Sequence, residues 1–226
     1  MWKETDMKHL FMTMLAFLVC LLVPASGQSA ALTPVQIAEK VQETYEKTTS
    51  FKADFLQTST VSTMEHRQRK GSGSMVIQKP GLLRWDYTAP EKQVLVSDGE
   101  TFSLYFAAEN QMIITPAKEY LREDVTYNFF AGKGNLLQDF EVLPPTSAPE
   151  KQGILAISLI PKKTHAQVEI LNVWVDEGTF LVNRLEIIDH LGSVTNLLLF
   201  NTEVNHAMPA EYFHFSPPEG TEIIEQ

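Results

Sequence analysis

Histidines, serines and a short glycine-rich segment are the parts of this sequence whose residue types could support catalysis or metal binding. The histidines of the chain body besides His66 are His165, His190, His206 and His214. None belongs to an HExxH motif or to another ligand spacing of a metal site. The Gly-Ser-Gly-Ser run at 71–74 lacks the Gly-x-Ser-x-Gly pattern of a nucleophile elbow, and Gly-Lys-Gly at 132–134 lacks the rest of a phosphate-binding loop. We therefore expect no enzyme, no metal site and no cofactor.

The carboxylates give no catalytic arrangement either. Asp98 and Asp176 fall at predicted turns, where a short acidic side chain stabilises the backbone. Asp54 and Asp86 fall on polar faces of predicted strands, where solvation accounts for them. A hydrolase whose site is assembled from residues far apart in the sequence stays open as an alternative.

The balance of charge restricts the partners. The chain has 18 Lys and Arg against 28 Asp and Glu, a formal net charge of −10. Because phosphate binding needs a clustered basic face, we expect no nucleic acid partner. The same charge disfavours residence on anionic membranes, although it could serve solubility alone.

The N-terminus has the pattern of an export signal. Lys3, Lys8 and His9 precede an apolar run over residues 10–23, which is too short to span a membrane and ends in small residues. We expect residues 1–27 to be a cleaved signal peptide and residues 28–226 to form one exported domain. Cys20 lies inside the apolar run, so we interpret it as part of the signal rather than as a lipidated N-terminus.

The elements that follow are mostly strands. A helix over 33–48 begins at Thr33-Pro34, and apolar and polar residues then alternate with period two from Ser50 onwards. The predicted strands cover residues 50–57, 72–78, 82–87, 92–97, 101–106, 111–115, 140–143, 154–161, 167–176, 181–190 and 193–204, with a short last one at 212–215. Turn residues such as Asp98-Gly99 make neighbouring strands antiparallel. A sheet of about ten strands curls or closes rather than staying flat.

Residues 116–138 interrupt this pattern. Apolar residues recur there at three- and four-residue spacing, which predicts one short helix and a second turn around residues 135–138. The apolar positions are Leu121, Val125, Phe129 and Phe130. We expect them to form a lid over the sheet.

Several strands carry large apolar side chains on both faces, which a sheet covered on one side would not need. One interpretation is a filled core on one face and helices on the other. The other is a hollow barrel that takes an apolar ligand of variable shape. The side chains predicted to line such an interior are Met75, Ile77, Leu83, Trp85, Leu104, Met112, Ile114 and Trp174.

Four segments resemble the periplasmic outer-membrane lipoprotein carrier protein family. They are Ser-Phe-Lys-Ala-Asp-Phe-Leu-Gln at 50–57, Lys-Pro-Gly-Leu-Leu-Arg-Trp-Asp-Tyr at 79–87, Val-Leu-Val-Ser-Asp-Gly at 94–99 and Phe-His-Phe-Ser-Pro-Pro-Glu-Gly-Thr at 213–221. The resemblance covers essentially the whole chain after the signal. It implies a single curved antiparallel sheet that forms an incompletely closed β-barrel with an N-terminal helix and a helical lid.

The resemblance also implies a function. Family members are monomeric periplasmic carriers that bind lipoprotein acyl chains, accept them from an ATP-driven inner-membrane transporter and deliver them to an outer-membrane receptor lipoprotein. An arginine that anchors the lid in the family is Lys79 here, so we expect Lys79, with Arg84, to hold the lid. The family's tryptophan after Asp98-Gly99 is replaced by Ser103.

Two relatives of the same fold remain alternatives. One is a lipid-anchored outer-membrane receptor, which a diacylated Cys20 at the mature N-terminus would indicate. The other is an envelope sensor of mislocalised lipoproteins, a class that carries an added domain.

Overall fold

Helix α2 (Pro34–Lys47) opens the described fold in the computed structural model of the chain. Thr33 caps it, because the Thr33 hydroxyl accepts from the Gln36 N–H while the Gln36 side chain accepts from the Thr33 N–H. The proline at the first helical position needs no hydrogen-bond partner for its nitrogen. The buried side of the helix consists of Ile37, Ala38, Val41 and Tyr45. The helix predicted over 33–48 is confirmed.

Twelve strands form one sheet in the described part of the chain. They are β1 (Ser50–Val61), β2 (Arg67–Gln78), β3 (Leu82–Ala89), β4 (Gln93–Asp98), β5 (Thr101–Phe106), β6 (Gln111–Pro116), β7 (Phe140–Leu143), β8 (Ile154–Pro161), β9 (Ile170–Asp176), β10 (Val182–Ile188), β11 (Val194–Val204) and β12 (Glu222–Glu225). The predicted strand at 212–215 is wrong, since a 3-10 helix, η1 (Ala210–Phe213), lies there. Strand β12 was not predicted.

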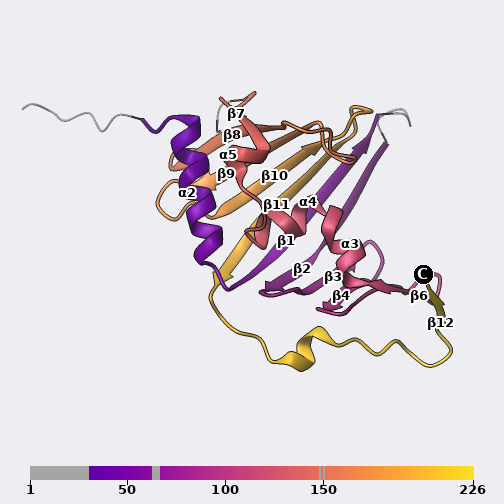
Figure 1. Ribbon diagram of the computed structural model, residues 1–226. Helices are drawn as coiled ribbons and strands as arrows, with labels where there is room; N and C mark the ends of the chain where they lie inside the picture. Colours follow the sequence, from indigo (N-terminus) through magenta and orange to yellow (C-terminus); the bar gives the residue numbers. More distant parts are fainter. Residues whose placement is uncertain (1–30, 63–66, 148, 150) are drawn as a thin grey trace, which may run out of the picture. The chain divides into compact units, whose positions relative to one another are not determined.

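The order of the strands is β12-β6-β5-β4-β3-β2-β1-β11-β10-β9-β8-β7. Neighbours pair antiparallel except at one edge, where β12 runs parallel to β6. The chain reaches that edge after η1, along a segment that passes beside β3 and β4 (Figure 1). The two end strands do not pair with each other. The mainly β, unclosed and curved sheet is therefore confirmed, whereas an entirely antiparallel sheet is wrong at β12.

The predicted short helix is two helices in the structure, and a third lies where the second turn was predicted. They are α3 (Ala117–Glu123), α4 (Val125–Phe130) and α5 (Leu136–Asp139). Asp124 separates the first two, because its backbone is extended and its carboxylate accepts from the Tyr127 N–H at 2.6 Å as the cap of α4. We use "lid" below for α3 and α4, residues 117–130.

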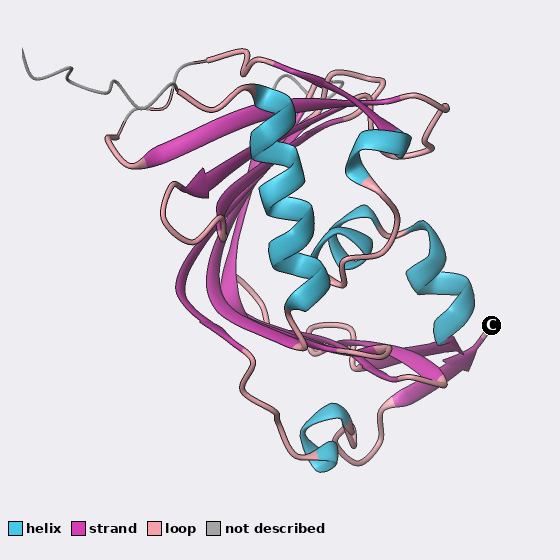
Figure 2. Ribbon diagram, turned by 60° about the vertical axis from the view of Figure 1, so that its left-hand side comes forward, coloured by secondary structure: helices cyan, strands magenta, loops and turns pink. Residues whose placement is uncertain are grey.

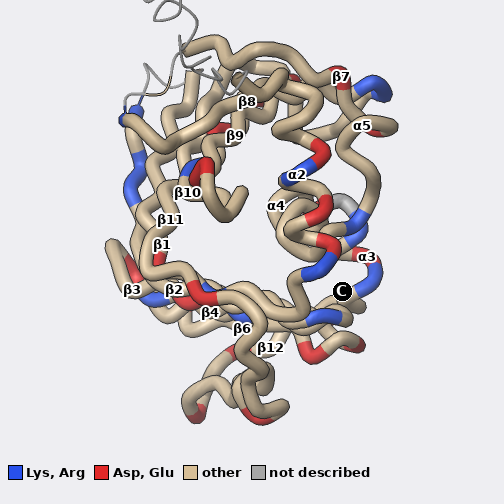
Figure 3. Tube along the Cα trace, turned by 90° about the vertical axis from the view of Figure 1, so that its left-hand side faces the viewer, with Lys and Arg blue, Asp and Glu red and all other residues tan. Residues whose placement is uncertain are grey.

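The sheet has a concave and a convex face. Helices α2 to α5 lie on the concave side, and η1 lies on the convex side (Figure 2). Seen along the sheet, the strands wrap around the helices (Figure 3). Residues that pair directly across neighbouring strands point to the same face, so the register assigns each side chain to one of the two faces.

The structure describes residues 31–62, 67–147, 149 and 151–226, and residues 33–226 form one compact unit. The predicted signal peptide at 1–27 and Cys20 lie outside the described residues. Among the residues that are described, no helix combines the length and the apolar character that a membrane span requires.

Candidate functional site

Rows of apolar side chains run across the concave face. One row consists of Ala53, Met75, Trp85, Leu95 and Leu104, which are successive partners across β1 to β5. A second row links Phe51, Ile77 and Leu83. Five of the predicted interior residues are therefore on this face, namely Met75, Ile77, Leu83, Trp85 and Leu104. All of these but the half-buried Leu104 are buried.

Met112 and Ile114 lie on the convex face, so their prediction as interior residues is wrong. Met112 pairs with Tyr105, and Ile114 pairs with Ser103. Both pack in a cluster with Phe213 of η1. Alternation along β6 places them together, but it does not tell which face of the sheet they share.

Trp174 is likewise on the convex face. It pairs with Arg184, whose guanidinium carbon lies 4.2 Å from the centroid of a Trp174 ring. Its neighbours Val173 and Val175 point to the concave side and are buried. The prediction that Trp174 lines the interior is wrong, because β9 is apolar on both faces.

The lid packs aromatic side chains into the concave face. Phe130 stacks on Phe51 with ring centroids 4.6 Å apart, and Phe129 lies 5.4 Å from Tyr45. At the other end of the lid, Tyr120 stacks on Phe102 at 3.7 Å. Of the four predicted lid residues, Leu121, Phe129 and Phe130 are buried and Val125 is partly buried. The lid thus occupies part of the interior as well as covering it.

A cavity of about 170 Å³ lies between the lid and the concave face. Its sheet wall consists of Gln57, Leu83, Trp85, Tyr87, Leu95, Ile187, Thr195 and Leu197, and its lid wall consists of Tyr120, Asp124, Thr126 and Tyr127. Pockets that hold drug-sized ligands measure roughly 300–1,000 Å³. With the lid in this position, the interior is neither solid nor large enough for a long apolar ligand.

The lid wall of this cavity contains a carboxylate. Burial raises the pKa of Asp124, against the opposing effect of the N–H groups of Tyr127 and Thr126 and the charge of His165. Burial also raises the pKa of Tyr87 to about 12 and raises that of Tyr120, and the charge of Asp124 adds to both shifts. The two phenols therefore stay neutral at neutral pH, and Asp124 is the acidic group that faces the cavity.

Lys79 acts on α2 rather than directly on the lid. Its Nζ donates to the Tyr45 carbonyl at 2.5 Å and to the Glu46 carbonyl at 3.4 Å, where α2 ends. Gly132, which follows the lid, packs so closely that a Cβ there would lie 3.1 Å from Lys79 Nζ and 2.8 Å from the Tyr45 oxygen. Lys79 therefore joins β2 to α2 at the point where the end of the lid passes. The expectation that Lys79 holds the lid directly is wrong, because its partners are the carbonyls at the end of α2.

Arg84 does not hold the lid. It lies on the convex face, where it donates to the Tyr212 carbonyl at 2.9 Å and to both carboxylate oxygens of Asp86. Its guanidinium also lies over the Tyr212 ring, 5.0 Å from the centroid. Arg84 thus fastens η1 to the sheet, and its prediction as a lid anchor is wrong because its strand position points outward.

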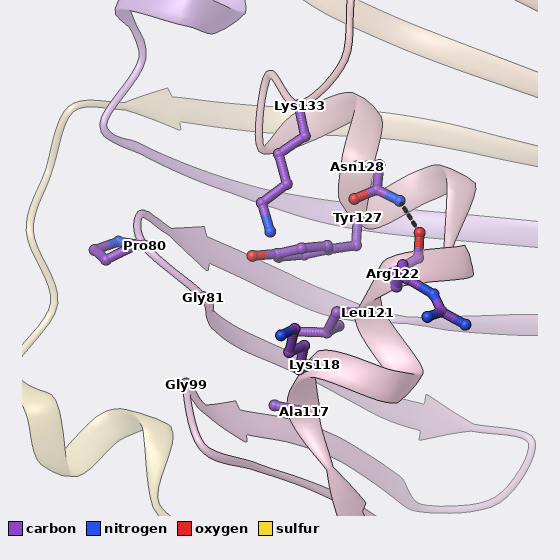
Figure 4. A pocket seen from close by; sticks show the side chains of 10 residues that line it. All are labelled: Pro80, Gly81, Gly99, Ala117, Lys118, Leu121, Arg122, Tyr127, Asn128 and Lys133. Carbon is purple, nitrogen blue, oxygen red and sulfur yellow. Dashed lines mark hydrogen bonds between the residues drawn. The ribbon is translucent and has the colours of Figure 1, made fainter.

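Two further hollows flank the lid. One, of about 550 Å³, lies between the lid and the turns at Gly81 and Gly99, and Lys118, Arg122 and Lys133 are among its lining residues (Figure 4). Lys133 Nζ lies 4.8 Å from the centroid of the Tyr127 ring. The other, of about 380 Å³, lies between the lid, α5 and Leu171 of β9. The lid is therefore bordered by space on both sides.

The set of residues predicted to line the interior leaves out several buried ones. Tyr45, Phe51, Phe55 and Tyr127 are buried at the contact between helices and sheet. The alternation at 51–55 was a usable signal for the two phenylalanines. The position of Tyr127 depends on the break at Asp124, which periodicity does not reveal.

Comparison with known proteins identifies the group to which this architecture belongs. Residues 46–216 match the family described as outer membrane lipoprotein carrier protein LolA. The outer-membrane lipoprotein carrier protein of Azotobacter vinelandii is 29% identical over 205 residues, which cover 89% of this chain and 96% of that protein. The chain belongs to this carrier family.

Other members and a solved structure agree. The outer-membrane lipoprotein carrier protein of Pseudomonas fluorescens is 30% identical over 155 residues, or 69% of this chain and 72% of that protein. An uncharacterized conserved protein from Thermus thermophilus superposes with a TM-score of 0.53 at 14% identity, covering 85% of this chain and 98% of that chain. At that identity the likeness supports the fold alone.

Membership in the carrier family means that the chain is not an enzyme. Within the residues that the structure describes, no three His, Cys, Asp or Glu side chains are grouped as metal ligands would be.

Proposed function

We propose that this chain is a periplasmic carrier that shields the acyl chains of lipoproteins on their way from the inner to the outer membrane. Two observations support the proposal. The chain belongs to the lipoprotein carrier family, and its concave face is apolar under a lid that covers a cavity. The predicted export signal fits the same compartment. The observation that carries the proposal is the aromatic lid seated in an apolar interior.

The free energy of transfer explains why such an interior is needed. Each methylene buried from water contributes about 0.8 kcal/mol, so two or three long acyl chains represent tens of kcal/mol. A carrier must cover that surface throughout the crossing. The rows that contain Met75, Trp85 and Leu104 supply a matching apolar wall.

Binding requires the lid to move. The cavity of about 170 Å³ lies below the range of pockets that hold even drug-sized ligands. Phe129 and Phe130 occupy the neighbouring interior space, against Tyr45 and Phe51. Acyl chains that displace these rings exchange one apolar contact for another, so opening costs little hydrophobic free energy once the ligand is present.

Delivery then depends on docking. Because the apolar contacts with several chains are worth too much for free release, we propose direct transfer between the carrier and its partners. The partners in this proposal are an ATP-driven inner-membrane transporter that loads the carrier and an outer-membrane receptor lipoprotein that unloads it. Return of the lid aromatics to the interior favours the emptied state.

Fluorescence of Trp85 tests acyl binding. Trp85 lines the cavity, whereas Trp174 lies on the convex face, so the Trp174→Phe variant leaves Trp85 as the reporter in residues 28–226. We expect a diacylated lipopeptide to change the Trp85 emission and the deacylated peptide to leave it unchanged. The same response to both peptides would contradict the proposal.

A further inference from the structure

The interior of this carrier is not apolar throughout. Along β1 the concave-face residues Phe51, Ala53 and Phe55 are buried and apolar, and then Gln57 and Ser59 follow on the same face. The change occurs beside Trp85, because the Phe55 and Trp85 rings are 5.2 Å apart. The cavity beneath the lid thus has an apolar end and a polar end, and Trp85 lies near the boundary between them.

The polar end is an ordered row of hydrogen bonds. The Tyr87 hydroxyl donates to Gln57 Oε1 at 2.7 Å, and Gln57 Nε2 donates to Ser59 Oγ at 3.2 Å. The Ser59 hydroxyl in turn lies 3.0 Å from that of Thr195. These groups satisfy one another across β3, β1 and β11.

Trp85 is the exception in this region. Its side chain is about nine-tenths buried and lines the cavity, yet its Nε1–H has no acceptor among the described residues. A buried N–H donor without an acceptor loses its bonds to water and gains nothing in return. The indole nitrogen has no exposed surface in the closed interior, so this unpartnered donor can meet the carbonyl oxygen of a ligand only after the interior rearranges, as the proposed lid movement requires.

The polar end also leads out of the interior. Gln57 and Tyr87 line the cavity and also line a groove of about 310 Å³ on its outer side. The far part of this groove is formed by Ser59, Arg69 and Glu91 together with their neighbours. A ligand with an apolar tail and a polar head would find the tail environment at Leu83 and Leu197 and the head environment beyond Tyr87.

The carboxylate of Asp124 on the lid limits which chemical groups a ligand can place in the cavity. Asp124 faces the same cavity, with Tyr87 and Tyr120 around it. An anionic phosphate there would meet a carboxylate at close range, which is unfavourable in a buried site. A neutral carbonyl accepts a hydrogen bond without adding charge.

We propose that Trp85 Nε1 donates a hydrogen bond to an acyl-ester carbonyl of the bound lipid, at the point where the acyl chains join the polar part of the molecule. The tails then lie along the apolar rows, and the peptide leaves through the groove at Gln57 and Tyr87. This assignment rests on the proposed carrier function and adds a polar contact that fixes the direction in which the cargo lies.

The test compares two lipopeptides of equal chain length, one with acyl esters and one with the corresponding alkyl ethers, which lack the carbonyls. For the full mature chain we expect the ester form to bind about three- to tenfold more tightly, the range for one neutral hydrogen bond. The Trp85→Phe variant should bind both forms equally. The Trp174→Phe variant, whose change is on the convex face, should keep the ester preference.

A spectroscopic readout avoids dependence on the Trp85→Phe variant. In the ¹⁵N-labelled protein, the Trp85 indole N–H resonance, assigned by its persistence in Trp174→Phe, should move downfield with the ester ligand and not with the ether. Equal affinities and equal resonance positions for ester and ether, with both bound better than the deacylated peptide, would overturn the ester contact alone. If neither acylated form binds better than the deacylated peptide, the carrier proposal itself fails.

A competition experiment tests whether the ester can belong to a phospholipid as well as to a lipoprotein. Phospholipids of the same chain length, one a diester and one a diether, are offered as competitors of the lipopeptide. Stronger competition by the diester supports the ester contact and extends it to any diacylglyceryl lipid. Competition by the diether as strong as by the diester would count against the contact.

Discussion

The two faces of the sheet carry apolar clusters of similar residue types that are covered in different ways. On the convex face, Val76, Val94, Val96, Tyr105 and Met112 are sealed by Phe213. The segment that bears Phe213 is fastened by Arg84, and β12 anchors it again further on. On the concave face the cover is the lid, whose two short helices are separated at Asp124 and border a cavity.

The difference lies in the fastening rather than in the apolar contacts. The segment that covers the convex face ends in β12, which pairs with β6. Near its middle, the charged Arg84 side chain, paired with Asp86, donates a hydrogen bond to the Tyr212 carbonyl. The lid is held by aromatic contacts, by a backbone hydrogen bond from the Ala117 N–H to the Glu100 carbonyl, and, just beyond it, by the close approach of Gly132 to Lys79. If the proposed function holds, strand alternation builds a permanent core on the convex face and an exchangeable one on the concave face.

Truncation of the convex cover should have the largest effect. Phe213 is 1% exposed, and Phe213→Ala leaves a cavity in the convex cluster, which Met208, Tyr212 and Phe215 of the same segment cover only in part. We expect the free energy of unfolding in urea to fall by about 3–5 kcal/mol, as for other buried aromatic residues. Binding of acylated lipopeptide by the folded fraction should be unchanged. If Phe213→Ala lowers the free energy of unfolding less than Phe130→Ala does, the convex cover is not the more firmly held of the two.

Phe130→Ala tests the exchangeable cover. Phe130 is equally buried. In the proposed function, however, the lid separates from the sheet while the rest of the fold stays intact. We expect a smaller loss of about 2–3 kcal/mol, with hydrogen-exchange protection lost in residues 117–131 and kept in β1 to β5. Affinity for diacylated lipopeptide should rise or stay constant. Loss of protection throughout the sheet would show that the lid is part of the permanent core.

Gly132 tests the corner at which the lid passes Lys79. Its φ is +61°, and an added Cβ would meet the Tyr45 carbonyl at 2.8 Å. Gly220 has a φ of +81° and no atom within 4 Å of such a Cβ. Both changes to Ala carry the backbone cost of about 1–2 kcal/mol, so the additional destabilisation in Gly132→Ala measures the corner itself. Thermal unfolding of the two variants side by side gives that difference, and equal melting temperatures would refute the tight contact.

Asp124 should give the smallest effect, a dependence on pH. Its pKa in the folded state is raised by burial, so its contribution to stability is fully present below the unfolded pKa near 3.8 and is lost as pH rises through the folded value. We expect lid closure to strengthen on acidification. Asp124→Asn keeps a capping side chain and should remove this dependence. The measurement is Trp85 emission against pH in the Trp174→Phe background. The charge of His165 lowers the pKa of the Asp124 carboxyl, so His165→Gln is the matched control for the pH dependence of the emission.

The fold was largely predictable because strand period and turn residues are local signals. Eleven predicted strands and the helix after Thr33 are present, although β1 ends at Val61 rather than at residue 57 and β2 begins at Arg67 rather than at residue 72. Strand β12 gave no such signal, since its four residues read Glu-Ile-Ile-Glu and it pairs with β6, which lies far earlier in the chain. The break of the lid at Asp124 was hidden for a similar reason, because a capping carboxylate looks like an ordinary polar position.

The site was less predictable because both faces of the sheet are apolar. Along β6 the sequence Met112, Ile113, Ile114 fits either orientation, and only the pairing with β5 decides that Ile113 faces Leu104 on the concave side. Trp174 between two valines presents the same ambiguity. Lys79 was predicted to hold the lid, but its partner is the Tyr45 carbonyl of α2, which lies 34 residues earlier in the chain. No sequence spacing reports such a contact.

The open edges of the sheet affect how readily copies of the protein associate at high concentration. A curved sheet that does not close offers two rows of unpaired backbone groups to other copies of itself. Here each edge ends in a strand of only four residues, β12 with Glu222 and Glu225 and β7 with the exposed Glu141. Such short acidic borders repel one another and offer few bonds for strand addition. We therefore expect the protein, despite its apolar interior, not to polymerise through the edges of its sheet at high concentration.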